Sequence, residues 1–298
     1  MNIFYKEPIY RPPSEANSLL IHATLGCQYD CDFCGMYTSK RFQVRPVKEI
    51  IKDLDAAKLN YGSSVRRIFL LDGNAFVCHP KVLLQVAEHA NKIFPNLNRI
   101  SAYTHASDVL RRSPEDLKKL SDHKMNMLYL GIETGDSDLL HKINKETDKE
   151  QLIEAAQKLH QADIKMSGTI MLGIAGNDPK KSFQHAKETA DLINQMKPSI
   201  KKPWYISALT TMIAPDTKLE KDLSFKLQNT IEVLQELKTL FMFLKDDLHG
   251  LIFRSNHASN YLNLQSNDLS KNKNDLLRQI DYALDHPEVL KADWMRGL

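Results

Sequence analysis

The sequence predicts an α/β fold in which strands and helices alternate along most of the chain. From about residue 18 to residue 217, short apolar or β-branched runs are followed by longer stretches with apolar residues three and four positions apart. Repetition of this kind implies a parallel sheet with crossover helices. Six such units are two fewer than a closed eight-unit barrel has, so the pattern predicts an open barrel or a doubly wound sheet.

The expected strands share an apolar or β-branched run and cover residues 19–24, 67–71, 99–103, 127–132, 164–172 and 205–212. The expected helices between them cover residues 47–59, 81–93, 114–122, 149–162 and 179–196. Pro46 suits the start of the first helix, because a proline lacks the N–H that would need a partner there.

The alternation stops after Pro215, and the rest of the chain is expected to form a helical extension. Its pattern predicts one long helix over residues 223–244, a short apolar run at 251–253, a polar loop at 265–274 and a final helix at 272–284. We therefore expect a core over residues 1–220 and an extension over 221–298 that covers the substrate side of the barrel.

Composition excludes several classes of protein. The 40 Lys and Arg residues against 37 Asp and Glu leave a net charge of +3, which argues against a strongly basic nucleic-acid binder. A hydrophobic share of 42% with 26% charged residues is that of a globular protein rather than a disordered one. No signal peptide is evident and no apolar run is long enough to span a bilayer, so we expect a cytoplasmic protein.

Three of the four cysteines lie in one short loop after the first expected strand. Cys27, Cys31 and Cys34 have C-x3-C-x2-C spacing, and three thiolates so close together can hold an iron–sulfur cluster with one iron left open. An open coordination position is typical of a catalytic metal site. The alternatives are a structural zinc with Cys78 or a histidine as the fourth ligand, or an electron-transfer cluster that uses Cys78. For Cys78 we expect the ordinary role of a small buried apolar residue.

The cysteine loop, with Phe33 just before its last cysteine, resembles that of the radical S-adenosylmethionine (radical SAM) enzymes. The run from Gly131 to Gly135 resembles a later motif of the same family, and the overall resemblance extends from Tyr10 to about Leu219. It implies a partial (β/α)6 barrel of the TIM type. It also implies a [4Fe–4S] cluster on the three cysteines, whose open iron chelates S-adenosylmethionine. One-electron reduction then yields methionine and a 5′-deoxyadenosyl radical, which abstracts hydrogen from a substrate carbon.

The resemblance also implies cofactor contacts at the carboxyl ends of the strands, where barrel sites form. The cofactor-binding residues that we expect are Phe33, Asp72, Gly73, Asn74, Glu133, Thr169, Leu172 and Ile174. The turn at Asp72 has a single glycine and departs from the family's glycine-rich turn, so an ordinary strand-to-helix turn is the alternative. Glu133 ends an apolar strand, and burying its carboxylate requires a polar ligand or a cation nearby.

Three residues are candidates for a direct catalytic or substrate contact. His105 follows the third expected strand and faces the barrel mouth, with helix capping as the alternative. Arg254 and His257 belong to a polar stretch in the extension that we interpret as a substrate floor, with a solvated loop as the alternative.

The function that these observations favour is radical chemistry on a small molecule. A single set of cluster cysteines predicts no auxiliary cluster, the short N-terminal region leaves no room for a cobalamin domain, and the near-neutral charge argues against RNA. A tetrapyrrole precursor and RNA remain alternative substrates, and a non-catalytic iron–sulfur carrier is the alternative class. The resemblance implies a flavodoxin or ferredoxin as reductant.

Overall fold

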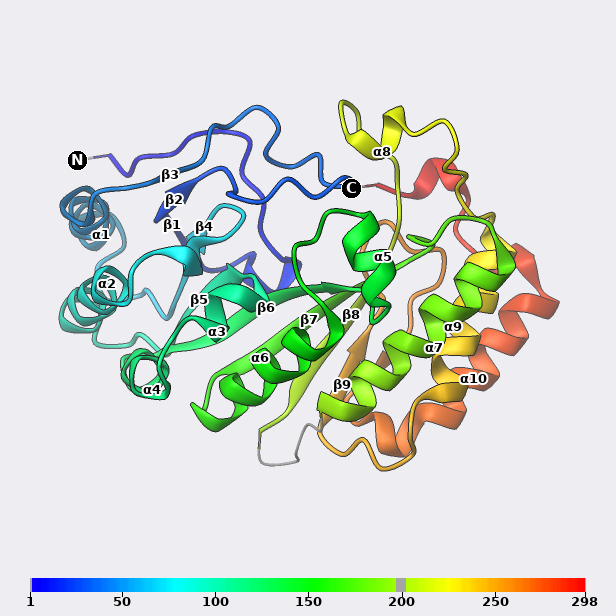
Figure 1. Cartoon of the computed structure of the whole chain (residues 1–298). Helices are drawn as coiled ribbons and strands as arrows, with labels where there is room; N and C mark the ends of the chain where they lie inside the picture. The colour runs from blue at the N-terminus through cyan, green and yellow to red at the C-terminus, as the bar shows by residue number, and fades with distance from the viewer. Residues whose placement is uncertain (1, 197–201, 298) are drawn as a thin grey trace. The chain divides into compact units, whose positions relative to one another are not determined.

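A computed structural model describes residues 2–196 and 202–297 of the chain (Figure 1). Its main sheet has eight strands in the order β1-β4-β5-β6-β7-β8-β9-β10. These strands are β1 (Leu19–His22), β4 (Arg67–Leu71), β5 (Arg99–Thr104), β6 (Met125–Glu133), β7 (Lys165–Leu172), β8 (Trp204–Thr210), β9 (Leu251–Arg254) and β10 (Gln265–Ser266). Neighbours from β1 to β6 and from β7 to β9 are parallel, whereas β10 is antiparallel to β9. The predicted α/β class with a mostly parallel sheet is confirmed.

The helices follow the strands in the expected alternation, with α3 and α5 as two short additions. They are α1 (Val47–Tyr61), α2 (Pro80–Ile93), α3 (Ala106–Leu110), α4 (Pro114–Asp122), α5 (Ser137–Lys142), α6 (Lys149–Gln161), α7 (Pro179–Met196), α8 (Lys218–Lys221), α9 (Thr230–Phe243) and α10 (Leu269–Asp285). Two very short strands, β2 (Thr24–Leu25) and β3 (Gln43–Val44), form a separate antiparallel ribbon. In the described part of the chain, no helix combines the length and apolar character needed to cross a membrane.

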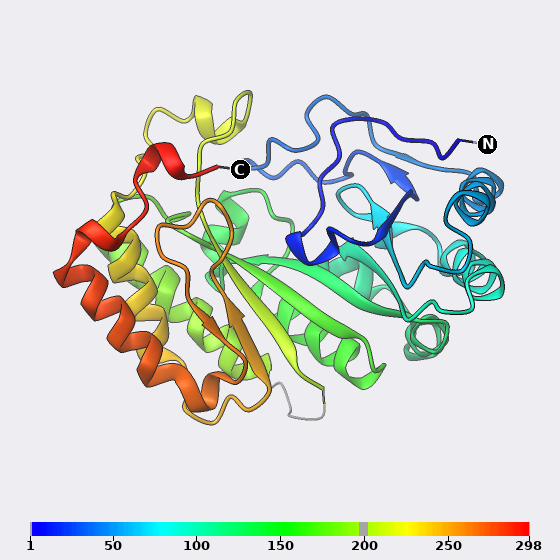
Figure 2. The same cartoon turned by 180° about the vertical axis from the view of Figure 1, so that it is seen from behind.

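The chain divides into two compact units. The first comprises the chain up to Asp30 together with Cys34–Leu130 and Ala155–Met166, and in it α1, α2 and α4 lie in a row (Figure 1). The second comprises Cys31–Phe33, Gly131–Glu154 and the chain from Ser167 onward. In this second unit α7, α9 and α10 lie side by side, and α10 also contacts β9 (Figures 1 and 2).

One long helix was expected over residues 223–244, and this prediction is wrong. The structure has the short helix α8 and then α9, which begins only at Thr230. Leu223 is 87% exposed, so no apolar burial favours a helix there. Asn229 and Glu232 form a capping box in which each side chain accepts a hydrogen bond from the other residue's backbone N–H, and this sets the start of α9.

The polar loop expected at residues 265–274 is also wrong. Gln265 pairs with Arg254 and Ser266 with Phe253, so the segment begins as strand β10. Helix α10 then starts at Leu269, which is fully buried and outweighs the polar composition around it. The short apolar run at 251–253 is strand β9, which extends the parallel sheet beside β8 (Figure 2).

Candidate functional site

The three clustered cysteines lie in the loop that follows β2. Cys27, Cys31 and Cys34 are half-buried, whereas Cys78 is buried. Burial raises the pKa of Cys78 to about 11, so this residue is a neutral thiol near pH 7, as expected of a packing residue. Within residues 2–196 and 202–297, no three His, Cys, Asp or Glu side chains are gathered as a ready-made metal site. The assignment of the loop cysteines therefore rests on their donor chemistry and spacing.

Asp72, at the end of β4, holds the cysteine loop from within the first unit. Its carboxylate is 3.1 Å from Lys40 Nζ, and both side chains are fully buried. The same carboxylate accepts a hydrogen bond of 2.8 Å from the backbone N–H of Gly26, the residue just before Cys27. His22 Nδ1 lies 3.8 Å away, and burial lowers the pKa of His22 by disfavouring its charged form. These contacts occupy the Asp72 carboxylate and favour a positioning role.

Gly73 and Asn74 complete this turn in different ways. A Cβ on Gly73 would lie 2.7 Å from Cys27 Cβ and 2.6 Å from the ring of Tyr37, so only glycine fits under the cysteine loop. Asn74 donates a hydrogen bond from Nδ2 to Asp108, which fixes the orientation of its amide. Its Oδ1 is buried and has no hydrogen-bond partner in the described part of the chain. A buried acceptor without a donor costs free energy, so Asn74 fits the N–H group of a ligand.

Glu133, at the end of β6, forms an ion pair with Lys145. Lys145 Nζ is 2.7 Å from Glu133 Oε1, and the two side chains are 9% and 8% exposed respectively. The sequence predicted a polar ligand or a cation near Glu133 without identifying either, and Lys145 is such a cation. A Cβ on Gly131 would lie 2.6 Å from Lys145 Nζ, so this glycine leaves the space that the pair fills.

The backbone around this pair is strained. Glu133 has a φ of 62°, and Asn144 and Glu146 on either side of Lys145 have φ values of 54° and 52°. A residue other than glycine in this left-handed region costs of order 1–3 kcal/mol, and such residues cluster at functional sites. The strain supports the prediction that Glu133 belongs to a site and adds Lys145 to it.

Phe33 and Ile174, two of the predicted cofactor residues, lie in the same apolar cluster of the second unit. Ile174 is buried there with Ile143 and Leu219, and Phe33 packs against the cluster. The backbone of Asp32 holds this arrangement, because its N–H donates to Ile143 O at 3.0 Å and its C=O accepts from Leu219 N at 2.8 Å. The cluster is thus a buried apolar core of the second unit, with Phe33 at its partly exposed edge.

The remaining predicted residues on β7 point to opposite faces of the sheet. Leu172 is buried, whereas Thr169 is half-buried on the other face. The strand registers place Thr169 opposite Ser207 on β8, and Ser207 opposite Arg254 on β9. These three polar residues therefore form one row across the less covered face of the sheet.

The three catalytic candidates have local structural partners. His105 stacks on Tyr29 with a centroid distance of 4.0 Å and accepts a hydrogen bond from Ser107 N at the start of α3. Arg254 donates to Ser266 O and Asn267 Oδ1 next to β10, each at 2.6 Å. These contacts favour helix capping for His105 and a strand-bracing role for Arg254.

His257 sits in a tight turn, where its Nδ1 lies 2.9 Å from Ser259 Oγ. Burial lowers the pKa of His257 by disfavouring its charged form, and nearby Lys291 adds to this effect. The same polar stretch continues to Asn260, which is buried and donates to Ala208 O on β8 at 2.7 Å. The stretch is thus hydrogen-bonded to the sheet at Asn260, in contrast to a solvated loop.

A buried carboxylate from the extension reaches the end of β7. Glu236 on α9 accepts hydrogen bonds from Gly173 N at 2.7 Å and Ser182 Oγ at 2.6 Å, and it lies 3.4 Å from His185 Nε2. Burial alone would raise the pKa of Glu236, but His185 and these hydrogen bonds outweigh it and lower the pKa. His185 Nδ1 is 2.7 Å from Thr134 Oγ1, beside Glu133. Helix α9 is thereby tied to the strand ends of the second unit.

Comparison with known families identifies the class of protein. The profile of the Radical SAM superfamily matches residues 21–192, which is more than half of the chain. The chain therefore belongs to the radical SAM superfamily. Its relatives are enzymes, and the family uses a [4Fe–4S] cluster and S-adenosylmethionine.

Among curated proteins, the chain is similar to the tRNA-2-methylthio-N(6)-dimethylallyladenosine synthase of Ehrlichia canis, with 25% identity over 62% of this chain and 42% of that protein. It is also similar to the heme chaperone HemW of Bacillus subtilis, with 24% identity over 55% of this chain and 44% of that protein. The chain thus spans less than half the length of each of these relatives.

Solved structures share the fold. A methylornithine synthase matches with a TM-score of 0.52 and 15% identity over 92% of this chain and 85% of that one. The coproporphyrinogen III oxidase of Escherichia coli matches with a TM-score of 0.53 and 15% identity over 76% of this chain and 52% of that one. Both are radical SAM folds, which agrees with the expected α/β architecture.

Proposed function

We propose that this chain holds a [4Fe–4S] cluster through Cys27, Cys31 and Cys34 and initiates radical chemistry on a small molecule. When bound, the cluster supplies one electron that breaks a C–S bond of S-adenosylmethionine, giving methionine and the 5′-deoxyadenosyl radical. That radical would take a hydrogen atom from a substrate carbon, which would leave 5′-deoxyadenosine and a substrate radical. The observation that carries this proposal is the set of three half-buried thiols with C-x3-C-x2-C spacing inside the segment that matches the family.

The chain's own residues would bind and orient S-adenosylmethionine. Asn74 Oδ1 accepts a hydrogen bond from the amino group of its methionine part, since this buried acceptor has no partner among the residues that the structure describes. Glu133 accepts a hydrogen bond from a ribose hydroxyl, and Lys145, which is ion-paired with its Oε1, orients the carboxylate. Phe33, which is partly exposed, contacts the adenine, and the buried Ile174 supports it through their shared apolar cluster.

The test is the formation of 5′-deoxyadenosine after anaerobic reconstitution with iron and sulfide, with dithionite as reductant. Chromatography should detect 5′-deoxyadenosine from the wild-type protein and none above background from Cys31→Ala. Cys78→Ala is the matched control, because it removes a buried thiol outside the loop and should leave the product. A cluster that forms normally but yields no 5′-deoxyadenosine would favour the alternative class, a non-catalytic iron–sulfur carrier.

Transfer RNA is a second candidate substrate, because the tRNA-2-methylthio-N(6)-dimethylallyladenosine synthases share about a quarter of their aligned residues with this chain. The net charge of +3 is small for a protein that binds a polyanion. Gel-shift titration with bulk transfer RNA at physiological salt distinguishes the two substrate classes. A salt-sensitive complex supports an RNA substrate, and the absence of a complex supports a small-molecule substrate.

We further propose a cytoplasmic location and a flavodoxin or ferredoxin as electron donor. A loop with three thiols needs a reducing compartment to remain available to iron. Replacement of dithionite by a reduced flavodoxin in the 5′-deoxyadenosine assay tests the donor: continued product formation supports it.

A further inference from the structure

A cavity of about 290 Å³ lies in the second unit at the carboxyl ends of β7 and β8. Gly173, Thr210 and Thr211 line it from the strand ends, and residues of the extension line the rest. None of Phe33, Ile174, Glu133 or Lys145, to which the S-adenosylmethionine contacts are assigned above, is among its lining residues. Two features of this cavity point to a ligand of its own.

The first feature is Arg296, whose guanidinium is fixed at the cavity wall. Its side chain is 8% exposed and lies 3.8 Å from the centre of the Tyr261 ring. Nε donates to Ser259 O at 2.6 Å, and Nη1 donates to Asp293 at 2.9 Å. Within the described residues Nη2 has no hydrogen-bond partner. A nearly buried guanidinium held in place with one nitrogen to spare is suited to bind an oxyanion such as a carboxylate.

The second feature is Gln228, which offers an acceptor at the same cavity. Its Nε2 donates to Gly176 O at 3.2 Å and to the Glu236 carboxylate at 2.7 Å, and these two acceptors fix which end of the amide carries the nitrogen. Its Oε1 is buried and finds no hydrogen-bond partner within residues 2–196 and 202–297. A Cβ on Gly173 would lie 3.5 Å from this oxygen, so the glycine leaves it uncovered on that side. An N–H group of a ligand would satisfy it.

We propose that this cavity binds the substrate through its carboxylate, at Arg296, and through an N–H group, at Gln228. The inference rests on the proposed function and names the substrate class for it: a free α-amino acid or a close derivative. The volume lies just below the usual range for small-molecule sites, which favours a ligand of amino-acid size over a tetrapyrrole or a nucleotide.

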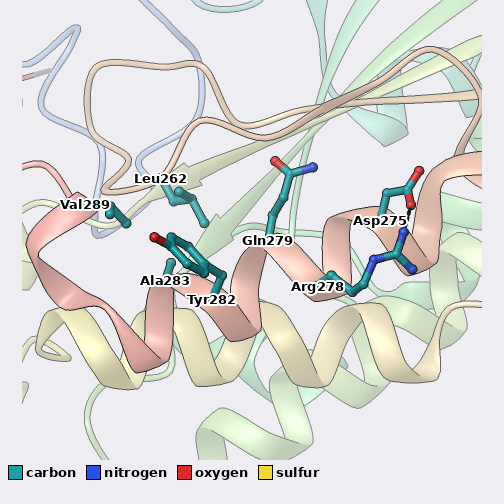
Figure 3. Close-up of a pocket in the computed structure, with 7 residues that line it drawn as sticks. All are labelled: Leu262, Asp275, Arg278, Gln279, Tyr282, Ala283 and Val289. Carbon is teal, nitrogen blue, oxygen red and sulfur yellow. Dashed lines mark hydrogen bonds and ion pairs between the residues drawn. The ribbon is translucent and has the colours of Figure 1, made fainter.

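A larger hollow on α10 provides the contrast and the control. It has a volume of about 470 Å³, and Figure 3 shows its arginine, Arg278, turned toward Asp275 at one end of it. Arg278 is 74% exposed, so its charge is already solvated. None of the residues that line this hollow has a buried polar atom without a partner. This surface hollow therefore lacks the features of a built site.

The test is a thermal-shift screen of the reconstituted protein with each standard L-α-amino acid as probe, followed by calorimetry of the probes that bind. We expect at least one amino acid to bind and its carboxamide, which lacks the negative charge, to bind about tenfold more weakly or worse. Arg296→Gln should weaken binding of the amino acid to the same degree, whereas Arg278→Gln should bind it with the affinity of the wild type. The unfolding temperature of each variant without probe shows that it is folded.

Three results would overturn the inference: no amino acid binds, the carboxamide binds equally well, or S-adenosylmethionine competes with the probe for the same site. A probe labelled with deuterium on carbon should also transfer deuterium to 5′-deoxyadenosine. Binding and 5′-deoxyadenosine formation without probe are measured separately. A protein that makes 5′-deoxyadenosine but binds no amino acid therefore contradicts this inference alone, and one that makes none contradicts the proposed function.

Discussion

Two strands of this protein end in the same local arrangement and use it differently. Asp72 after β4 and Glu133 at the end of β6 both have a positive φ, of 73° and 62°, and each carboxylate is bonded to a lysine. The Asp72–Lys40 pair is fully buried and also binds the backbone of Gly26. The Glu133–Lys145 pair is 8–9% exposed, and Lys145 Nζ contacts the carboxylate at Oε1. The first pair therefore fixes the cysteine loop, and for the second we keep the proposal that it contacts S-adenosylmethionine.

The largest expected effect is on the free energy of unfolding, at the fully buried Asp72–Lys40 pair. Asp72→Ala leaves the Lys40 ammonium buried without its partner, so we expect a loss of about 3–5 kcal/mol in the free energy of unfolding. Urea titration of the cluster-free protein measures it. Asp122→Ala is the control, because it breaks an exposed pair with Lys118 and should cost less than about 1 kcal/mol. Equal losses for the two substitutions would show that the buried pair stabilises the fold no more than an exposed one does.

The next largest effect is on the affinity for S-adenosylmethionine, which should differ between variants of the two ion pairs. Removing both charges at once avoids an uncompensated buried charge, so Asp72→Asn/Lys40→Met and Glu133→Gln/Lys145→Met should both fold. The first double variant should bind S-adenosylmethionine like the wild type. The second should raise its Kd about tenfold or more, because a charge-assisted contact is lost. Equilibrium dialysis with the reconstituted protein measures both constants. If instead the first double variant had the raised Kd and the second bound like the wild type, the roles assigned to the two pairs would have to be exchanged.

A smaller effect is expected at Gly131, which leaves the space for the second pair. In Gly131→Ala the new Cβ would lie 2.6 Å from Lys145 Nζ, so the pair must move, at a cost of about 1–3 kcal/mol. The same unfolding titration measures the loss, with Gly297→Ala as control because nothing lies near its Cβ position. An unchanged stability in Gly131→Ala would mean that the pair does not depend on this glycine.

The smallest effect extends the comparison to the cysteines. Because the pKa of Cys78 is raised to about 11, its reactive thiolate is scarce at pH 8 and increases only as the pH rises toward that value. Iodoacetamide should therefore label Cys27, Cys31 and Cys34 of the folded, cluster-free protein before Cys78. Peptide mass spectrometry gives the order, and early labelling of Cys78 at pH 8 would contradict its burial.

Much of this architecture can be predicted from the sequence because apolar periodicity reports burial directly. The six expected strands and the five helices between them are present, and their ends shift by a few residues at most. The prediction failed for residues 223–244, where the apolar Leu223 is exposed and the capping box at Asn229 starts the helix late. A single apolar residue does not reveal whether tertiary structure will cover it.

Less of the candidate site could be predicted from the sequence, because its ion pairs depend on how the chain folds. The need for a cation near Glu133 follows from the cost of burying a carboxylate, but its identity depends on a turn that brings Lys145 back over Gly131. Lys40 was missed for the same reason, because only the folded loop brings it to Asp72. The roles of the predicted cofactor residues stay predictions, and the structure adds the two lysines to them.

The most direct test of the account is Mössbauer spectroscopy of the wild-type protein reconstituted with ⁵⁷Fe, with and without S-adenosylmethionine. A cluster held by Cys27, Cys31 and Cys34 has one iron without a protein thiolate, so the account predicts that S-adenosylmethionine changes the signal of one iron site and leaves the others. A spectrum that stays the same in its presence, or iron that does not assemble into a four-iron cluster, would contradict it.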